Sequence, residues 1–192
     1  MIAIIKYNAG NIASVKNAVE RLGFDCKITD DEEIIRSAEQ IIFPGVGEAA
    51  SAMKYLKERE LDKLIKSAKQ PLLGICLGLQ LLCKHTEEGN TFCMNIFDTA
   101  VKKFPVQDIV PHMGWNNLID IECSLFDGIS SSTDYYFVHS YYAEICEDTK
   151  AKCNYILPFS AVMQKDNYFA TQFHPEKSAS LGERILCNFL ND

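Results

Sequence analysis

Cys76 is the residue of this chain whose setting most favours nucleophilic chemistry. It stands in Gly74-Ile75-Cys76-Leu77-Gly78, between an apolar run at 71–73 and a helical run at 79–82. A side chain on a sharp turn between a strand and a helix needs small neighbours, so this spacing predicts a nucleophile elbow with cysteine in place of serine. The amino end of the helix would favour the thiolate. The same residues also fit a buried structural cysteine between two packing glycines.

A thiolate nucleophile needs a base, and the chain has four histidines. His174 is the preferred candidate, because Glu176 follows two residues later across the rigid Pro175. The carboxylate can then orient one ring nitrogen while the other faces Cys76. The alternative is a strand-end histidine with a surface hydrogen bond. The other histidines are expected at a helix cap or in solvent (His85), in a loop (His112) and at a buried strand end (His139).

Hydrolysis through a thioester also needs two N–H groups that bind the developing oxyanion. The backbone N–H of Leu77 is one candidate, because this residue follows the nucleophile. The second should come from another loop at a strand end, and Pro44-Gly45-Val46-Gly47 suits this role because glycines let the backbone approach a ligand. The same loop also fits the dinucleotide pattern G-x-G-x-x-A. That match is weak, since the next strand does not end on the required acidic residue.

Length and composition favour one domain that spans residues 1–192. The chain has 192 residues, 47% of them hydrophobic, and a net charge of −7 without a Lys/Arg run, which argues against nucleic acid as a partner. It lacks a signal peptide and an apolar run of about 18 residues, so we expect no membrane segment. Its eight cysteines form no C-x-x-C pair. We therefore expect a reducing cytoplasm, no metal and no cofactor.

The pattern of elements predicts an α/β fold with a mixed, largely parallel central sheet flanked by helices. Strands are expected at 2–6, 24–29, 40–43 and 71–73, and helical patterns lie between them, including an amphipathic run at 49–67. After Thr86, short alternating runs predict an antiparallel or mixed half. These runs lie at 97–104, 135–138, 152–156, 161–165 and 168–173, and a closing helix is expected at 181–190. The chemistry should lie in loops at the carboxyl ends of the strands.

Two motifs make the chain resemble a known family. Gly74-Ile75-Cys76-Leu77-Gly78-Leu79-Gln80 and Gln172-Phe173-His174-Pro175-Glu176-Lys177-Ser178 are similar to the class I, or triad, glutamine amidotransferases. Four further segments resemble one branch, the glutaminase subunits of imidazole glycerol phosphate synthase in histidine biosynthesis. They are residues 7–11, 44–47, 111–116 and 136–141. The resemblance covers both ends of the chain.

The resemblance implies roles for individual residues. Cys76, His174 and Glu176 would form the triad, and the N–H groups of Val46 and Leu77 the oxyanion hole. Glutamine would be held by Gly45, Gln80, Ser140 and Tyr141, and hydrolysed to glutamate and ammonia. The implied partner is a (β/α)₈-barrel cyclase in a 1:1 heterodimer, which uses the ammonia to make imidazole glycerol phosphate and an aminoimidazole nucleotide. The expected partner contacts are Asn8, Asn11, Trp115 and Lys177.

Three other functions remain open on the sequence. An amidotransferase subunit of the same branch could serve another acceptor synthase. A Cys-His peptidase or a γ-glutamyl hydrolase would share the elbow. A binding module without catalysis would follow if Cys76 were only a core residue.

Overall fold

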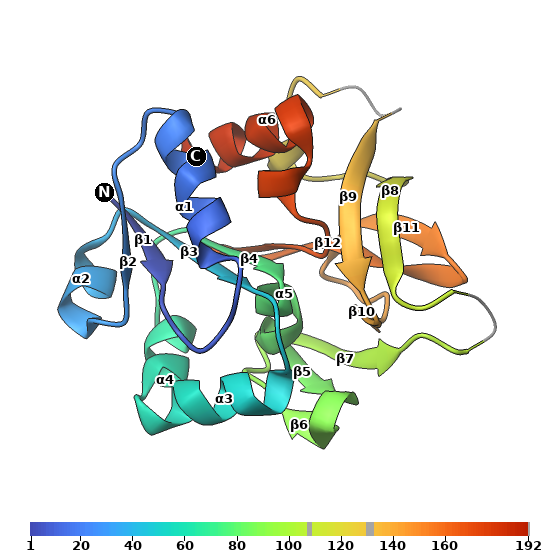
Figure 1. The fold of residues 1–192 in the computed structure, drawn as a ribbon, viewed down its shortest axis with the longest axis horizontal. Helices are drawn as coiled ribbons and strands as arrows, with labels where there is room; N and C mark the ends of the chain where they lie inside the picture. Colours follow the sequence, from blue (N-terminus) through green and yellow to red (C-terminus); the bar gives the residue numbers. More distant parts are fainter. Residues whose placement is uncertain (107–108, 130–132, 192) are drawn as a thin grey trace.

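The first half of the chain builds the parallel part of a large sheet, as expected. The computed structural model describes residues 1–106, 109–129 and 133–191. Its first four strands are β1 (Ile2–Ile5), β2 (Cys26–Thr29), β3 (Gln40–Gly45) and β4 (Leu72–Cys76). They pair in parallel in the order β2-β1-β3-β4 (Figure 1). Every residue of β1, β3 and β4 is buried, as apolar strands with both faces covered must be.

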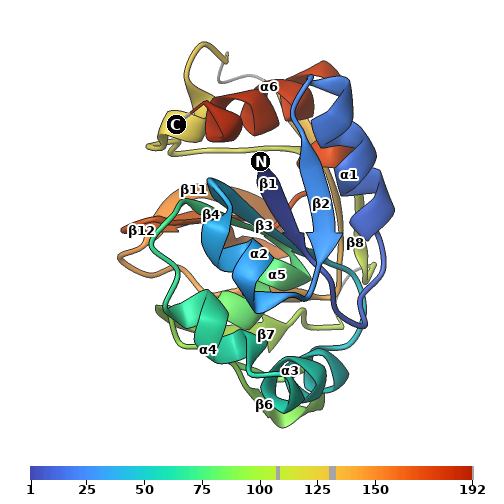
Figure 2. The same ribbon diagram turned by 90° about the vertical axis from the view of Figure 1, so that its left-hand side faces the viewer.

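Helices cover both faces of this sheet (Figures 1 and 2). The six α-helices are α1 (Ile12–Arg21), α2 (Glu32–Ser37), α3 (Ala49–Glu58), α4 (Leu61–Lys66), α5 (Leu77–Leu82) and α6 (Ala179–Leu190). Apolar residues of α1 and α6 share one core cluster with one face of the strands. Those of α2 to α5 share a second cluster with the other face. The sheet thus separates two hydrophobic cores, and its strand ends lie free for a site.

The amphipathic run at 49–67 is two helices rather than one, which corrects the sequence-based expectation. Glu60 has a φ of 56°, which breaks the helical path between α3 and α4. All four residues at 57–60 are charged and exposed, so no apolar side chain ties this turn to the core.

The second half continues the sheet in mixed orientation. β13 (Tyr168–Thr171) pairs in parallel with β4, and the sheet then runs through β12 (Leu157–Lys165), β10 (Tyr141–Ala143), β7 (Phe97–Lys103), β5 (Cys83–Thr86) and β6 (Thr91–Phe92). β11 (Thr149–Tyr155) pairs with β12 beside this path. Short 3₁₀ helices are η1 (Glu88–Asn90), η2 (Ser124–Phe126) and η3 (Pro175–Lys177). The mixed sheet expected after Thr86 is therefore confirmed.

A separate antiparallel pair, β8 (His112–Asn117) with β9 (Asp134–His139), stands beside the main sheet. The loop expected around His112 is therefore wrong: its residues pair across six positions with β9. Polar residues and Gly114 hid the strand, because only alternate positions of β8 face inward. His85 also lies in a strand, β5, and its Nε2 is 2.9 Å from Asn90 Oδ1 rather than capping α5.

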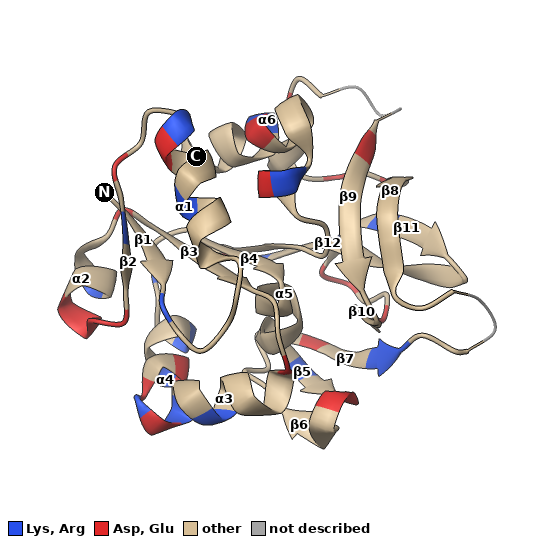
Figure 3. Cartoon of the chain, viewed as in Figure 1, with Lys and Arg blue, Asp and Glu red and all other residues tan. Residues whose placement is uncertain are grey.

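Charged side chains gather on α3, α4 and the exposed turns, whereas β8 carries none (Figure 3). No helix within the described ranges is long and apolar enough to cross a membrane. The same ranges contain no cluster of three or more His, Cys, Asp and Glu side chains suited to a metal ion.

Candidate active site

Cys76 occupies a strained turn where β4 passes directly into α5. Its backbone has φ 54° and ψ −103°, a conformation that costs energy for a residue with a Cβ. A Cβ on Gly78 would lie 1.9 Å from the carbonyl oxygen of Phe43, and one on Gly74 would lie 2.8 Å from Leu82 Cδ1. The two glycines are therefore needed because backbone and side chains approach closely there, and the predicted elbow geometry is present.

His174 and Glu176 form a buried pair just beyond β13. His174 Nδ1 lies 2.7 Å from Glu176 Oε1, and neither side chain is exposed to solvent. Asn11 also donates from its Nδ2 to Glu176 Oε1. Among the described residues, His174 Nε2 has no hydrogen-bond partner, so it is the ring nitrogen left for chemistry.

The charge of this corner follows from its neighbours. Burial lowers the pKa of His174, but Cys76 and Glu176 raise it more, through charge and hydrogen bonding, to about 10. The imidazole is therefore protonated at neutral pH beside Cys76. A thiolate paired with an imidazolium is the state that attacks a carbonyl carbon without a separate deprotonation step.

A pocket of about 270 Å³ opens over the sulfur. Several expected residues line it together: Val46, Cys76, Leu77, Gln80, Ser140 and Tyr141. Cys76 is thus 6% exposed but borders a cavity, which separates it from an ordinary core cysteine. Gly45 is not a lining residue; it pairs with Cys76 in the β3–β4 register, and a Cβ there would lie 1.9 Å from the Tyr7 hydroxyl oxygen.

Glu88 is a pocket residue to which no motif in the sequence points. Its Oε2 accepts from the backbone N–H of Ala49 at 2.8 Å, and the side chain lines the same pocket as Cys76. Burial raises the pKa of Glu88, with Glu48 adding to the rise and the Ala49 hydrogen bond opposing it. Among the described residues that line the pocket, Glu88 is the one with an acidic side chain. Its carboxylate suits a ligand with an ammonium group.

Two buried histidines adjoin the pocket. His112 Nδ1 lies 3.0 Å from His139 Nε2, and His139 Nδ1 lies 2.7 Å from the Tyr141 carbonyl oxygen. Burial lowers the pKa of His112 to about 4 and that of His139 to about 3, so both rings are neutral at pH 7. Because a carbonyl only accepts, His139 carries its proton on Nδ1 and accepts from His112 at Nε2. His112 Nε2 then accepts from Asn116 Nδ2 at 3.3 Å.

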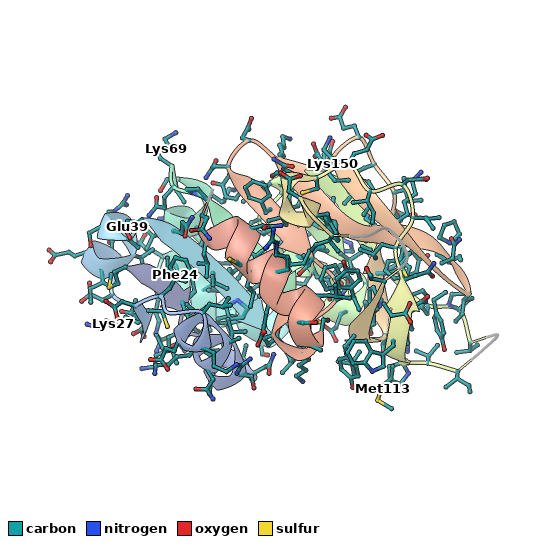
Figure 4. All side chains as sticks on the ribbon, turned by 90° about the horizontal axis from the view of Figure 1, so that it is seen from above. Phe24, Lys27, Glu39, Lys69, Met113 and Lys150 are labelled. Atoms are coloured by element: carbon teal, nitrogen blue, oxygen red, sulfur yellow. The ribbon has the colours of Figure 1, made fainter. Side chains whose placement is uncertain are left out.

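The residues expected at a partner interface do not all lie alike. Asn11 is half-buried at the Glu176 carboxylate, whereas Lys177 and Asn8 are exposed, the latter donating to the Ser51 carbonyl at 3.2 Å. Trp115 is 54% exposed on β8, with its ring 6.0 Å from that of Tyr136. Figure 4 shows its neighbour Met113 pointing away from the body of the molecule.

Comparison with known proteins agrees with this geometry. The family model described as "Glutamine amidotransferase class-I" matches residues 3–192. A protein of Bacteroides thetaiotaomicron named "Imidazole glycerol phosphate synthase subunit HisH" is 54% identical over 193 residues, covering 99% of this chain and 98% of its own. A protein of Pectobacterium atrosepticum with the same name is 44% identical over 192 residues, covering 98% of both chains.

Solved structures are similar in fold. A glutamine amidotransferase crystal structure matches with a TM-score of 0.74 at 21% identity, covering 100% of this chain and 98% of its own. A putative GMP synthase protein from Thermoplasma acidophilum matches with a TM-score of 0.75 at 20% identity, covering 100% and 92%. The chain therefore belongs to the class-I glutamine amidotransferase family and, within it, to the family of HisH subunits of imidazole glycerol phosphate synthase.

Proposed function

We propose that Cys76 hydrolyses the side-chain amide of L-glutamine to give glutamate and ammonia. The sulfur attacks the amide carbon, and the backbone N–H groups of Val46 and Leu77 receive the negative charge that forms on the oxygen. The imidazolium of His174 protonates the departing nitrogen, while Glu176 holds the ring in place. Water then cleaves the thioester. The observation that carries this proposal is the strained Cys76 in a pocket, with the unbonded Nε2 of a buried His174–Glu176 pair beside it.

Substrate recognition follows from the polar groups that line the pocket. The Glu88 carboxylate suits the α-ammonium group of glutamine, and the Ser140–Tyr141 segment lies on the opposite wall. Gln80 donates from Nε2 to the Tyr141 carbonyl at 3.0 Å, which ties this segment to α5. Gly45 contributes indirectly, because only glycine leaves room for Tyr7 beneath the oxyanion loop.

We further infer that the ammonia passes to a (β/α)₈-barrel cyclase in a 1:1 complex in the cytoplasm. The relatives are named as subunits of a synthase, which supports a partner. Ammonia released into neutral water becomes ammonium and is no longer a nucleophile, so the consuming site must adjoin this one. The whole span 1–192 serves as one amidotransferase domain in this proposal. Asn8, Asn11, Trp115 and Lys177 are its candidate partner contacts.

The experiment that tests this function is the substitution Cys76→Ala in the complex with the partner. It removes the nucleophile, so we expect glutamine-dependent synthesis to fall to background. Synthesis from added ammonium salt should persist, because that reaction needs no thiolate. Retained glutamine hydrolysis, or the loss of both reactions in an intact complex, would contradict the proposal. Cleavage of peptides rather than free glutamine by the unsubstituted chain would point to a peptidase instead.

A further inference from the structure

Gln172 is a fully buried polar residue next to the nucleophile that the proposed reaction does not yet use. It follows β13, and its backbone N–H donates to the Ala161 carbonyl at 2.8 Å, which extends the pairing with β12. Its side-chain Nε2 lies 3.6 Å from the Sγ atom of Cys76. A rigid sheet therefore holds an amide donor against the sulfur.

The orientation of this amide is fixed by a backbone group. The Tyr141 carbonyl can only accept, so the side-chain atom of Gln80 that lies 3.0 Å from it must be the nitrogen. The same Gln80 nitrogen lies 3.2 Å from the next amide, where it requires an acceptor, and that acceptor is Gln172 Oε1. The nitrogen of Gln172 must then face Cys76. A flipped Gln172 would set two donors against each other and leave the sulfur without one.

The spacing of the chain places this amide beside the catalytic base. Gln172 and His174 are two residues apart in an extended segment, so their side chains leave the backbone on the same side. Phe173 points the other way into the core, where its ring lies 4.6 Å from that of Tyr135. Cys76 thus receives the imidazole and the amide from the same segment.

We propose that Gln172 is a further catalytic residue, whose side-chain N–H donates to the Cys76 sulfur and stabilises its negative charge. This inference rests on the proposed function of Cys76. The charge is present in the resting thiolate, and it returns when water attacks the thioester. In that step the new C–O bond forms, the C–S bond breaks with its electron pair on sulfur, and the proton of water passes to His174.

The expected size of the effect follows from the strength of a hydrogen bond to an ion. A donor that contacts only the charged form of an acid favours ionisation. Losing the Gln172 donor should raise the midpoint pH for alkylation of Cys76 by about one unit. At a fixed pH below that midpoint, the reactive thiolate fraction would fall about tenfold.

The test measures alkylation of Cys76 by iodoacetamide against pH in the full chain, with peptide mass spectrometry to separate Cys76 from the other cysteines. Gln172→Met keeps the length of the side chain without a donor, and Gln172→Glu keeps the shape but offers only acceptors when ionised. Gln40→Met is the matched control. Gln40 is also buried, but its Nε2 donates to the Phe189 carbonyl at 2.9 Å, away from the sulfur.

We expect the midpoint to rise in both Gln172 variants and to stay unchanged in Gln40→Met, whatever the melting temperatures. In the complex, glutamine kcat/KM of Gln172→Met should fall more at pH 6.5 than at pH 9. Unchanged midpoints in both Gln172 variants would overturn the inference, and Gln172→Glu decides if Gln172→Met does not fold. If Cys76 of the unsubstituted chain alkylates only at the pH of an ordinary thiol, the proposed function itself fails.

Discussion

Two buried histidine regions flank one pocket, and their electrostatics are opposite. At the triad corner the pKa of His174 rises to about 10, whereas the pKa values of His112 and His139 fall to about 4 and about 3. Burial acts in the same direction on all three rings. The difference lies in the neighbours, because of these three rings only that of His174 adjoins anions, those of Cys76 and Glu176.

The histidine pair has dipoles and aromatic rings where the triad has charges. The ring of His112 stacks on Tyr155 at 4.0 Å and on Phe137 at 4.8 Å, and its nitrogens meet His139 and Asn116. A neutral imidazole both donates and accepts, so the pair forms a directed hydrogen-bond chain that ends on the Tyr141 carbonyl. The same residue type therefore serves proton transfer in one region and alignment of a substrate-binding segment in the other.

The largest effect should come from removing the charge that sets the triad corner apart. Glu176→Gln keeps the shape but removes the anion, so we expect glutaminase kcat to fall by about 10²–10⁴-fold, less than in Cys76→Ala. The pKa of His174, followed by NMR, should fall towards that of an ordinary histidine. Glu183→Gln, at an exposed carboxylate paired with Arg21, is the control. A loss equal to that of Cys76→Ala would give Glu176 another task.

The second effect tests the neutral pair through acid stability. In the unfolded chain both histidines bind protons near pH 6.5, whereas in the folded chain they do so only near pH 4 and below. The unfolded state thus binds more protons between these values, so the free energy of unfolding falls as the pH drops from about 6.5 to about 4. The two rings together should contribute a loss of about 2–3 kcal/mol between pH 6 and pH 5.

Urea unfolding at both pH values measures this loss. The double variant His112→Phe with His139→Phe keeps aromatic rings in the cluster but removes both titrating groups. Its stability at pH 6 can differ from that of the unsubstituted chain, yet its change between pH 6 and pH 5 should be smaller by the stated amount. The same acid dependence in both proteins would show that neither ring is held neutral.

The contrast between the regions also separates what the sequence predicts from what it does not. Gly74 and Gly78 predicted the elbow because a local turn imposes its own spacing, and the His174–Glu176 pair lies two residues apart. The parallel strands follow from local apolar runs. These features need no knowledge of distant contacts.

The remaining parts of the site depend on contacts between distant residues. His112 meets His139 across 27 residues, and Gln172 meets Cys76 across 96. Glu88 enters the pocket from a short 3₁₀ turn with no periodicity of its own. Chain spacing carries no signal for such pairs, because only the folded sheet brings them together.

The smallest effect concerns the outer face of β8, opposite the histidine pair. His112 and Asn116 face inward, whereas Trp115 and Met113 alternate with them and are exposed. Large exposed apolar side chains on a strand without charges suit a protein partner, and tryptophan is enriched among residues that dominate binding energy. Trp115→Ala should therefore weaken association with the partner by about 2 kcal/mol, about thirtyfold in Kd.

Calorimetric titration of the two subunits measures this change. Phe92→Ala is the matched control, because Phe92 is an aromatic side chain 71% exposed on β6, away from β8. The acid dependence of stability should be the same in Trp115→Ala as in the unsubstituted chain, since the substitution leaves the inner face of β8 intact. An unchanged Kd with a lowered melting temperature would assign Trp115 to the core. A loss of binding together with a changed acid dependence would mean that the two faces of β8 act as one unit, so that partner contact reaches the Tyr141 segment through His112 and His139.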